Sequence, residues 1–107
     1  MAIDRIPFLE DLLTKKPGDA FGRYALAMEY AKVERTGEAL ASFERLVTDH
    51  PDYCAGYHQQ GRLLVRLGRT DDAMKALEQG IAAARRVGNA HERKEMEALL
   101  EELSDDR

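Results

Sequence analysis

The sequence has no tryptophan, one cysteine and only three prolines among its 107 residues. The lone Cys54 cannot form a disulfide within the chain, which fits a reducing compartment. No apolar run approaches the roughly 18 residues that cross a bilayer, and no basic leader followed by an apolar stretch opens the sequence. These absences predict a soluble, cytoplasmic protein with no membrane partner.

Basic residues are also outnumbered. Sixteen Lys and Arg stand against twenty Asp and Glu, which gives a net charge of -4. Such a surface repels phosphate backbones unless its basic groups cluster, so nucleic acid is disfavoured as the main partner. A basic cluster of Arg62, Arg66, Arg69, Arg85 and Arg86 keeps an anionic partner open as an alternative.

Signals for catalysis and for metal binding are missing too. His50, His58 and His91 have no metal-ligand spacing with one another or with Cys54. No nucleophile, base and orienting group occur together, and no phosphate-binding loop is present. The sequence therefore predicts no enzyme, no metal and no cofactor. Cys54 has Ala20 as its periodic equivalent, and two small residues in equivalent positions predict a packing role for the cysteine.

What the sequence does contain is an internal period of 34 residues. Subtracting 34 carries one set of residues onto another without a gap: Pro51 onto Pro17, Gly56 onto Gly22, Ala73 onto Ala39, Leu77 onto Phe43, and Ile81 onto Val47 and then Leu13. A period of this length indicates a unit that buries its apolar face against its neighbours. The predicted fold class is all-α, a solenoid of antiparallel helix hairpins.

Apolar periodicity and punctuation predict about six helices. Their approximate ranges are 4–16, 20–33, 38–49, 54–67, 71–87 and 90–103. Asp4, Asp19, Thr36 and Thr70 are predicted N-caps, because each has a short oxygen-bearing side chain just before a helical pattern. The pair Gly88-Asn89 is expected to end the fifth helix.

Two stretches match the consensus W-x2-L-G-x2-Y, A-x3-F, P. In the first, Leu26, Ala27, Tyr30, Ala39, Phe43 and Pro51 fill these slots, with Arg23 in place of the tryptophan. In the second, Tyr57, Gly61, Leu64, Ala73 and Leu77 fill them, whereas Gln60 takes the leucine slot and Arg85 the proline slot. The chain thus resembles the tetratricopeptide repeat (TPR) family.

The resemblance implies one domain over residues 1–107, built as a right-handed solenoid. Residues 4–16 would form a half repeat, 20–53 the first repeat, 54–87 the second and 90–103 a capping helix. Small residues at Ala27, Gly61, Ala39 and Ala73 would let paired helices approach closely, so a bulky residue at Ala39 or Ala73 is expected to overpack its hairpin.

In TPR folds the first helix of each hairpin lines a concave face. Helical spacing then predicts a partner-binding groove lined by Phe21, Tyr24, Met28 and Lys32 from one repeat and by His58, Arg62, Val65 and Arg66 from the next. The aromatic and methionine side chains would hold apolar groups, and the basic ones would attract acidic groups or a terminal carboxylate. This makes an adaptor that binds a peptide segment of another protein the leading hypothesis.

Two alternatives stay open from the residues. In one, Phe21 and Tyr24 pack against the first helix and the basic residues are a solvated face. In the other, the chain forms a homodimer through the groove or through the orphaned first helix. The apolar residues of that helix exceed what one neighbour can cover: Ile3, Ile6, Phe8, Leu9, Leu12 and Leu13. Chaperone-binding TPR domains grip a carboxylate with a lysine and an asparagine where Tyr24 and Met28 stand here, which argues against chaperone tails as ligands.

Overall fold

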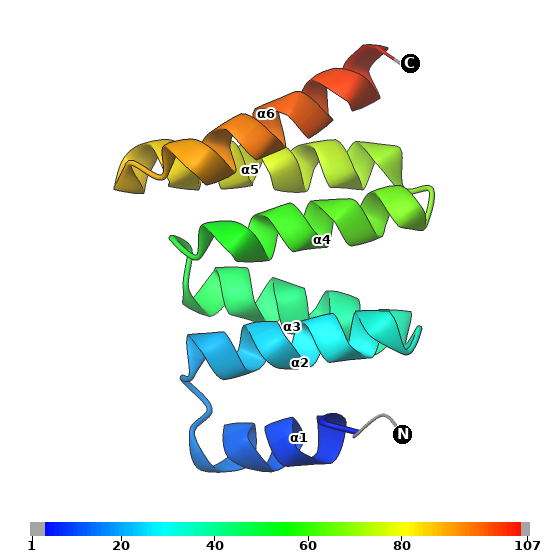
Figure 1. Cartoon of the computed structure of the whole chain (residues 1–107), viewed down its shortest axis with the longest axis vertical. Coiled ribbons are helices and arrows are strands. Elements are labelled where there is room, and N and C mark those ends of the chain that lie inside the picture. The colour runs from blue at the N-terminus through cyan, green and yellow to red at the C-terminus, as the bar shows by residue number, and fades with distance from the viewer. Residues whose placement is uncertain (1–3, 106–107) are drawn as a thin grey trace. The chain divides into compact units, whose positions relative to one another are not determined.

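A computed structural model describes residues 4–105 of the chain, and these residues hold six helices and no strand. The helices are α1 (Ile6–Lys15), α2 (Ala20–Lys32), α3 (Thr36–Asp49), α4 (Cys54–Arg66), α5 (Thr70–Val87) and α6 (Ala90–Asp105). Figure 1 shows them joined by short turns. The predicted all-α helical-repeat class is confirmed, and the predicted helix bounds agree within two residues at each end.

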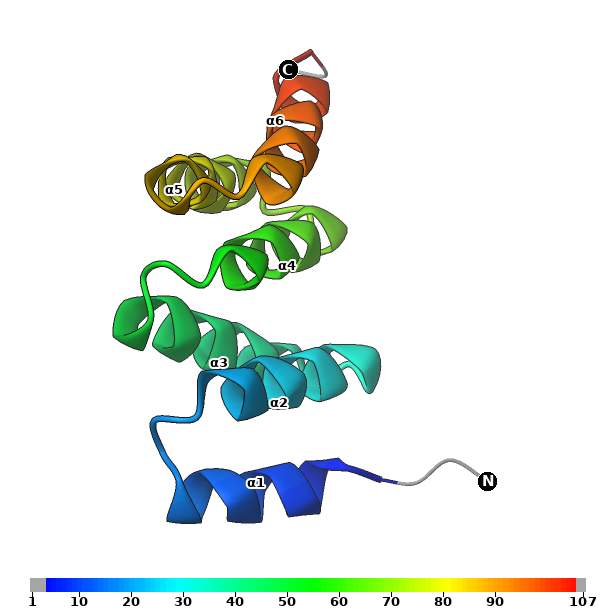
Figure 2. The same cartoon turned by 60° about the vertical axis from the view of Figure 1, so that its left-hand side comes forward.

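The helices form two compact units that divide between His50 and Pro51. In the first unit α2 packs against α3, and α1 packs against α2. In the second unit α4 packs against α5, and α6 packs mainly against α5 with a smaller contact to α4 (Figure 2). Each unit therefore contains one complete hairpin, α2–α3 or α4–α5, and one additional helix.

The predicted N-cap is confirmed at Asp19 and is wrong at Asp4 and at the two threonines; the N-cap of α1 is Arg5, one residue after Asp4. The Asp19 carboxylate accepts from the Gly22 N–H at 3.0 Å, and Asp4 accepts from the Ile6 N–H at 3.0 Å. Thr36 and Thr70 are instead the first residues of α3 and α5, and the N-caps before them make no side-chain capping bond.

Arginine–carboxylate pairs stand at these two helix starts. Arg35 precedes α3 and binds Glu38 in its first turn through two hydrogen bonds of 2.7 Å. Arg69 precedes α5 and binds Asp72 through two hydrogen bonds to the same oxygen, Oδ2, at 2.8 and 3.0 Å. The acidic first turn favours the helix N-terminus, and the arginine holds that carboxylate in place, so the threonine hydroxyl is not used as a cap.

Equivalent left-handed residues end the first helix of each hairpin. Glu34 has φ 63° after α2, and Gly68 has φ 76° after α4, 34 positions later. In both turns the next N–H reaches back five residues, from Arg35 to the Tyr30 carbonyl and from Arg69 to the Leu64 carbonyl, each at 2.9 Å. This bond satisfies a carbonyl that the helix end would leave open.

Replacing Glu34 with glycine is expected to raise stability by roughly 0.5–1 kcal/mol, because glycine adopts positive φ without the clash that a Cβ introduces. Gly68→Ala is the matched opposite change and is expected to lower stability by about 1 kcal/mol. Urea unfolding followed by circular dichroism measures both. Shifts of the same sign in the two variants would contradict this account of the turns.

The proline slot decides how far the second helix of each hairpin runs. In the first repeat α3 ends at Asp49, with His50 as its C-cap immediately before Pro51. A residue before proline is pushed out of the helical region, so the helix stops there. In the second repeat Arg85 replaces the proline, and α5 continues to Val87, where Gly88 closes it with φ 73° as predicted.

The small-residue slots lie where the paired helices meet. Ala27, Ala39 and Ala73 are completely buried. At Gly61 an added Cβ would lie 2.8 Å from Leu77 Cδ2, so α4 and α5 approach too closely for a larger residue there without rearrangement. The larger slot residues that fill the volume beside them are also buried: Leu26, Tyr30, Phe43, Tyr57, Leu64 and Leu77.

Gly80 is a close-approach position that the repeat consensus did not reveal. It lies on α5, and a Cβ there would come within 2.6 Å of Tyr57 Cβ on α4 and would also collide with the sulfur of Met96 on α6. Its equivalent in the first repeat is Leu46, which is completely buried. In the second repeat, Met96 of α6 therefore lies beside the position where the first repeat has its own Leu46 side chain.

The orphaned first helix buries only one side. Ile6, Leu9 and Leu13 are buried, whereas Phe8 is 70% exposed and Arg5 is exposed. Ser42 and Ala76, the repeat equivalents of Phe8, are 7% and 5% exposed. Phe8 therefore stands on a face that is covered in the two complete hairpins. Ile3, which the self-assembly hypothesis includes, lies outside the described residues.

Candidate functional site

The predicted site residues divide between two helices, each in a different unit. Phe21, Tyr24, Met28 and Lys32 share one stripe of α2 and are called the α2 face; His58, Arg62, Val65 and Arg66 share one stripe of α4 and are called the α4 face. Within each helix the spacing of three and four residues brings these side chains onto one side.

The α2 face is mainly apolar. The Phe21 side chain is 72% exposed, while Tyr24 and Met28 are half-buried beside it. Lys32 is exposed at the end of the helix, with its Nζ 3.7 Å from a carboxylate oxygen of Glu29. Phe21 has the largest exposed fraction among the large hydrophobic side chains of the described region. A packing role against α1 accounts for none of that exposed surface.

The α4 face is basic, and its residues differ in accessibility. Arg62 and Arg66 are exposed, and Val65 between them is half-buried. His58 is only 13% exposed, because α6 lies beside it and Glu92 Oε2 is 2.9 Å from its Nδ1. This contact was not predicted from the sequence, although Glu92 lies 34 residues after His58 and is therefore its repeat equivalent. The open part of the α4 face is therefore its C-terminal turn.

Most arginines of the second unit are already held by carboxylates. Arg69 pairs with Asp72 at 2.8 Å and Arg86 with Asp52 at 2.6 Å. Arg85 and Arg93 both bind Glu97 on α6, at 3.1 and 2.9 Å. The predicted basic cluster is thus largely neutralised. Arg62 makes no ion pair with any residue between 4 and 105.

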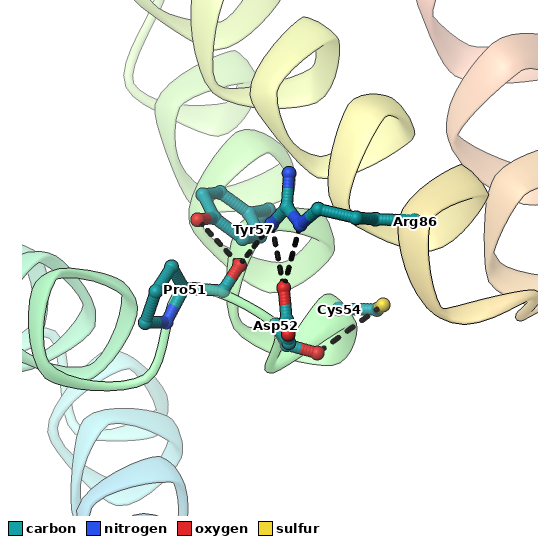
Figure 3. Close-up of polar contacts among 5 residues, drawn as sticks. All are labelled: Pro51, Asp52, Cys54, Tyr57 and Arg86. Carbon is teal, nitrogen blue, oxygen red and sulfur yellow. Dashed lines mark hydrogen bonds and ion pairs between the residues drawn. The ribbon is translucent and has the colours of Figure 1, made fainter.

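Hydrogen bonds from side chains of α4 and α5 hold the turn that precedes α4 (Figure 3). The Pro51 carbonyl accepts from Tyr57 Oη at 2.8 Å and from Arg86 Nη2 at 3.1 Å. The same guanidinium binds Asp52 Oδ1 through Nε at 2.9 Å and Nη2 at 2.6 Å. In the first repeat the tryptophan-slot residue Arg23 donates to the Pro17 carbonyl at 3.3 Å. A donor in this slot therefore ties each hairpin to the turn that precedes it.

Cys54 has the packing role that the sequence predicted. It is buried at the start of α4, and its Sγ donates to the Asp52 carbonyl at 3.5 Å (Figure 3). Burial, with a smaller contribution from the charge of Glu92, raises the pKa of the Cys54 thiol. Because the thiolate is the reactive form, this environment keeps the cysteine unreactive.

A tyrosine joins α1 to the first hairpin. Tyr30 Oη donates to Glu10 Oε2 at 2.5 Å, and the Arg35 guanidinium carbon lies 4.8 Å from the centre of the Tyr30 ring. Burial and the hydrogen bond to Glu10 raise the pKa of Tyr30 from 10.0 to about 12. The phenol therefore stays protonated and keeps donating throughout the neutral range. This bond fixes the orphaned helix against α2.

Between residues 4 and 105, no three His, Cys, Asp or Glu side chains gather closely enough to hold a metal ion. Within the same range, no helix combines the length and the apolar character that spanning a bilayer requires.

The chain has the features of a helical-repeat protein. Its two hairpins have small residues where the paired helices approach closely, a side-chain donor that bonds to the preceding turn, and a left-handed residue after the first helix. The family model for the tetratricopeptide repeat matches residues 55–86. A TPR repeat-containing protein of Pseudomonas aeruginosa is 32% identical over 95 residues, covering 89% of this chain and 90% of that protein. The chain therefore belongs to the tetratricopeptide repeat family.

Solved structures give the same result. A tetratricopeptide repeat domain protein of Salinibacter ruber is 41% identical, with a TM-score of 0.76 over 81% of this chain and 97% of that one. Protein BPP2914 of Bordetella parapertussis is 27% identical, with a TM-score of 0.81 over 99% and 90%. The TPR2B domain of yeast Sti1, in its complex with pHsp70, has a TM-score of 0.86 over 95% and 82%; at 20% identity it shows the fold alone.

Proposed function

We propose that this protein is an adaptor that binds peptide segments of other proteins through the first helix of a hairpin, with the α2 face and the α4 face as separate binding surfaces. The observation that carries the proposal is Phe21, which lies 72% exposed on the first helix of a hairpin with half-buried Met28 on the same stripe. Exposed aromatic and arginine side chains are the residues most enriched where binding energy concentrates. Membership of a family whose repeats generally serve protein interaction supports the same function.

The two faces offer different chemistry to a ligand. The α2 face presents an aromatic ring and a thioether, which bury apolar side chains. The α4 face presents guanidinium groups, which bind carboxylates through paired hydrogen bonds. The α2 face therefore fits apolar side chains of a ligand, and the α4 face fits acidic ones. Tyr24 and Met28 argue against a chaperone tail as the ligand.

Phe21→Ala is expected to weaken capture of a partner protein by about fivefold to thirtyfold or more, because removing an exposed aromatic anchor typically costs about 1–2 kcal/mol or more of binding free energy. The immobilised protein is exposed to extract from its own cells, and captured partners are quantified by mass spectrometry. Phe8→Ala is the matched control, since Phe8 is exposed to almost the same extent on α1. Equal capture by the wild type and both variants would contradict the proposal, provided that circular dichroism shows unchanged helix content.

Self-association is a second candidate, and Phe8 favours it. This ring is 70% exposed at a repeat position that is buried in both complete hairpins. A second copy packing on α1 would cover it and form an isologous dimer. Light scattering over a wide concentration range tests this: a dimer that Phe8→Glu converts to monomer supports it, and a monomer at the highest concentration excludes it.

A further inference from the structure

We infer that the C-terminal turn of α4 selects acidic peptides, with Arg62 as the anchor for a ligand carboxylate. The inference deepens the proposed function and rests on it, since it names the chemistry of the segment that the α4 face binds. It follows from the composition of α4, the pairing of the neighbouring arginines and the contact that closes the other end of the face.

The first observation is the charge of α4 itself. The chain carries twenty acidic residues and a net charge of -4. The other five helices of the described region each contain at least one Asp or Glu, whereas α4, Cys54–Arg66, contains none. Its exposed charges are Arg62 and Arg66. These positive charges attract acidic ligands, and α4 has no carboxylate of its own that would repel them.

The second observation distinguishes Arg62 from its neighbours. Arg69, Arg85, Arg86 and Arg93 each donate to a carboxylate at 2.6–3.1 Å. Arg62 is exposed on the α4 face, and the residues between 4 and 105 supply it with no carboxylate partner. Its planar group is therefore available for the paired hydrogen bonds that arginine makes with a carboxylate. Val65, three residues later and half-buried, offers an apolar contact beside it.

The third observation sets the limit of the site. One turn before Arg62, His58 is held by Glu92 of α6 at 2.9 Å, and both side chains are mostly buried. Glu92 occupies the imidazole and places a negative charge at that end of the face. An acidic segment is therefore confined to the turn that contains Arg62 and Arg66. The Glu92 carboxylate thus contacts His58 as the carboxylate of an acidic ligand would contact a basic side chain of this face.

The test is a selection from a random-peptide phage library on the immobilised full-length protein. We expect the selected peptides to be enriched in Asp and Glu relative to the library. Arg62→Gln is expected to weaken a synthetic selected peptide by about tenfold to a hundredfold in fluorescence anisotropy, the usual effect of losing a charge-assisted pair. Arg62→Lys, which keeps the charge but not the planar fork, should recover part of that loss.

Arg85→Gln is the matched control. It removes the same single charge from an exposed arginine of the same unit, but one that already binds Glu97. Binding by this variant should stay close to that of the wild type. Replacing the Asp and Glu of the peptide with Asn and Gln should reproduce the loss seen in Arg62→Gln and should not add to it.

The other outcomes overturn the inference in distinguishable ways. Peptides selected without acidic enrichment, or bound equally by Arg62→Gln and the wild type, would remove the acidic preference and leave peptide binding intact. Failure of the wild type to select any peptide would overturn the proposed function together with this inference. If the protein instead bound a random single-stranded oligonucleotide and no peptide, and if that binding depended on Arg62, the arginine would be a phosphate-binding residue.

Discussion

Phe43→Ala is expected to destabilise the first unit by about 3–5 kcal/mol, the usual cost of truncating a buried phenylalanine. Phe43 is 1% exposed on α3 and lies four residues after Ala39, at the point where α3 packs against α2. The truncation loses the free energy gained by transferring the ring from water into the core. It also leaves a cavity, which other side chains cannot fill without a movement of the helices.

Phe8→Ala is the control for that measurement. The residue change is the same, but Phe8 is 70% exposed, so the expected effect is within about 0.5 kcal/mol. Guanidinium unfolding followed by circular dichroism compares the two. Similar midpoints for both variants would mean that the register assigned to α1 and α3 is wrong.

Gly80→Ala is expected to lower stability by about 1–3 kcal/mol, although alanine is the better helix former by roughly 1 kcal/mol. The added Cβ would lie 2.6 Å from Tyr57 Cβ, which belongs to a buried side chain, and would collide with Met96. The Met96 sulfur is near the far end of a flexible side chain, whereas Tyr57 Cβ is fixed to the α4 backbone, so α4 and α5 must separate. The backbone amides of α4 should therefore exchange hydrogen faster than in the wild type.

Gly37→Ala provides the opposite expectation. Gly37 lies in the first turn of α3, and nothing stands within 4 Å of the Cβ that alanine would add. Here only helix propensity acts, so stability should rise by up to about 1 kcal/mol. The two glycine variants should therefore move the thermal midpoint in opposite directions. A gain at both positions would contradict the close approach of α4, α5 and α6.

The repeat period predicted the helices well because it combines two independent signals. Ala39 and Ala73 mark the close approach, and Pro17 and Pro51 mark the ends, at the same spacing. Local hydrogen-bond competition was harder to read. The threonines before α3 and α5 have the chemistry of N-caps, but the neighbouring arginine–carboxylate pairs organise those helix starts.

Contacts that depend on tertiary packing could not be found from periodicity. A Cβ at Gly80 would collide with Met96, which belongs to another helix, so the comparison with its repeat equivalent Leu46 did not indicate this close approach. The bond between His58 and Glu92 joins helices whose packing the consensus does not specify, although their 34-residue separation was a usable signal. Exposure of Phe21 and Arg62 is consistent with the predicted faces, and binding by these residues stays a prediction.

Site-specific photo-crosslinking tests the central claim that the first helices of the hairpins bind another protein. Benzoylphenylalanine is placed at position 21 in one sample and at position 8 in another, and the full-length protein is irradiated in its native cells. The account predicts a heterologous adduct from position 21 that is absent from position 8. An adduct of twice the chain mass from position 8, with none from position 21, would contradict it and establish self-association through α1.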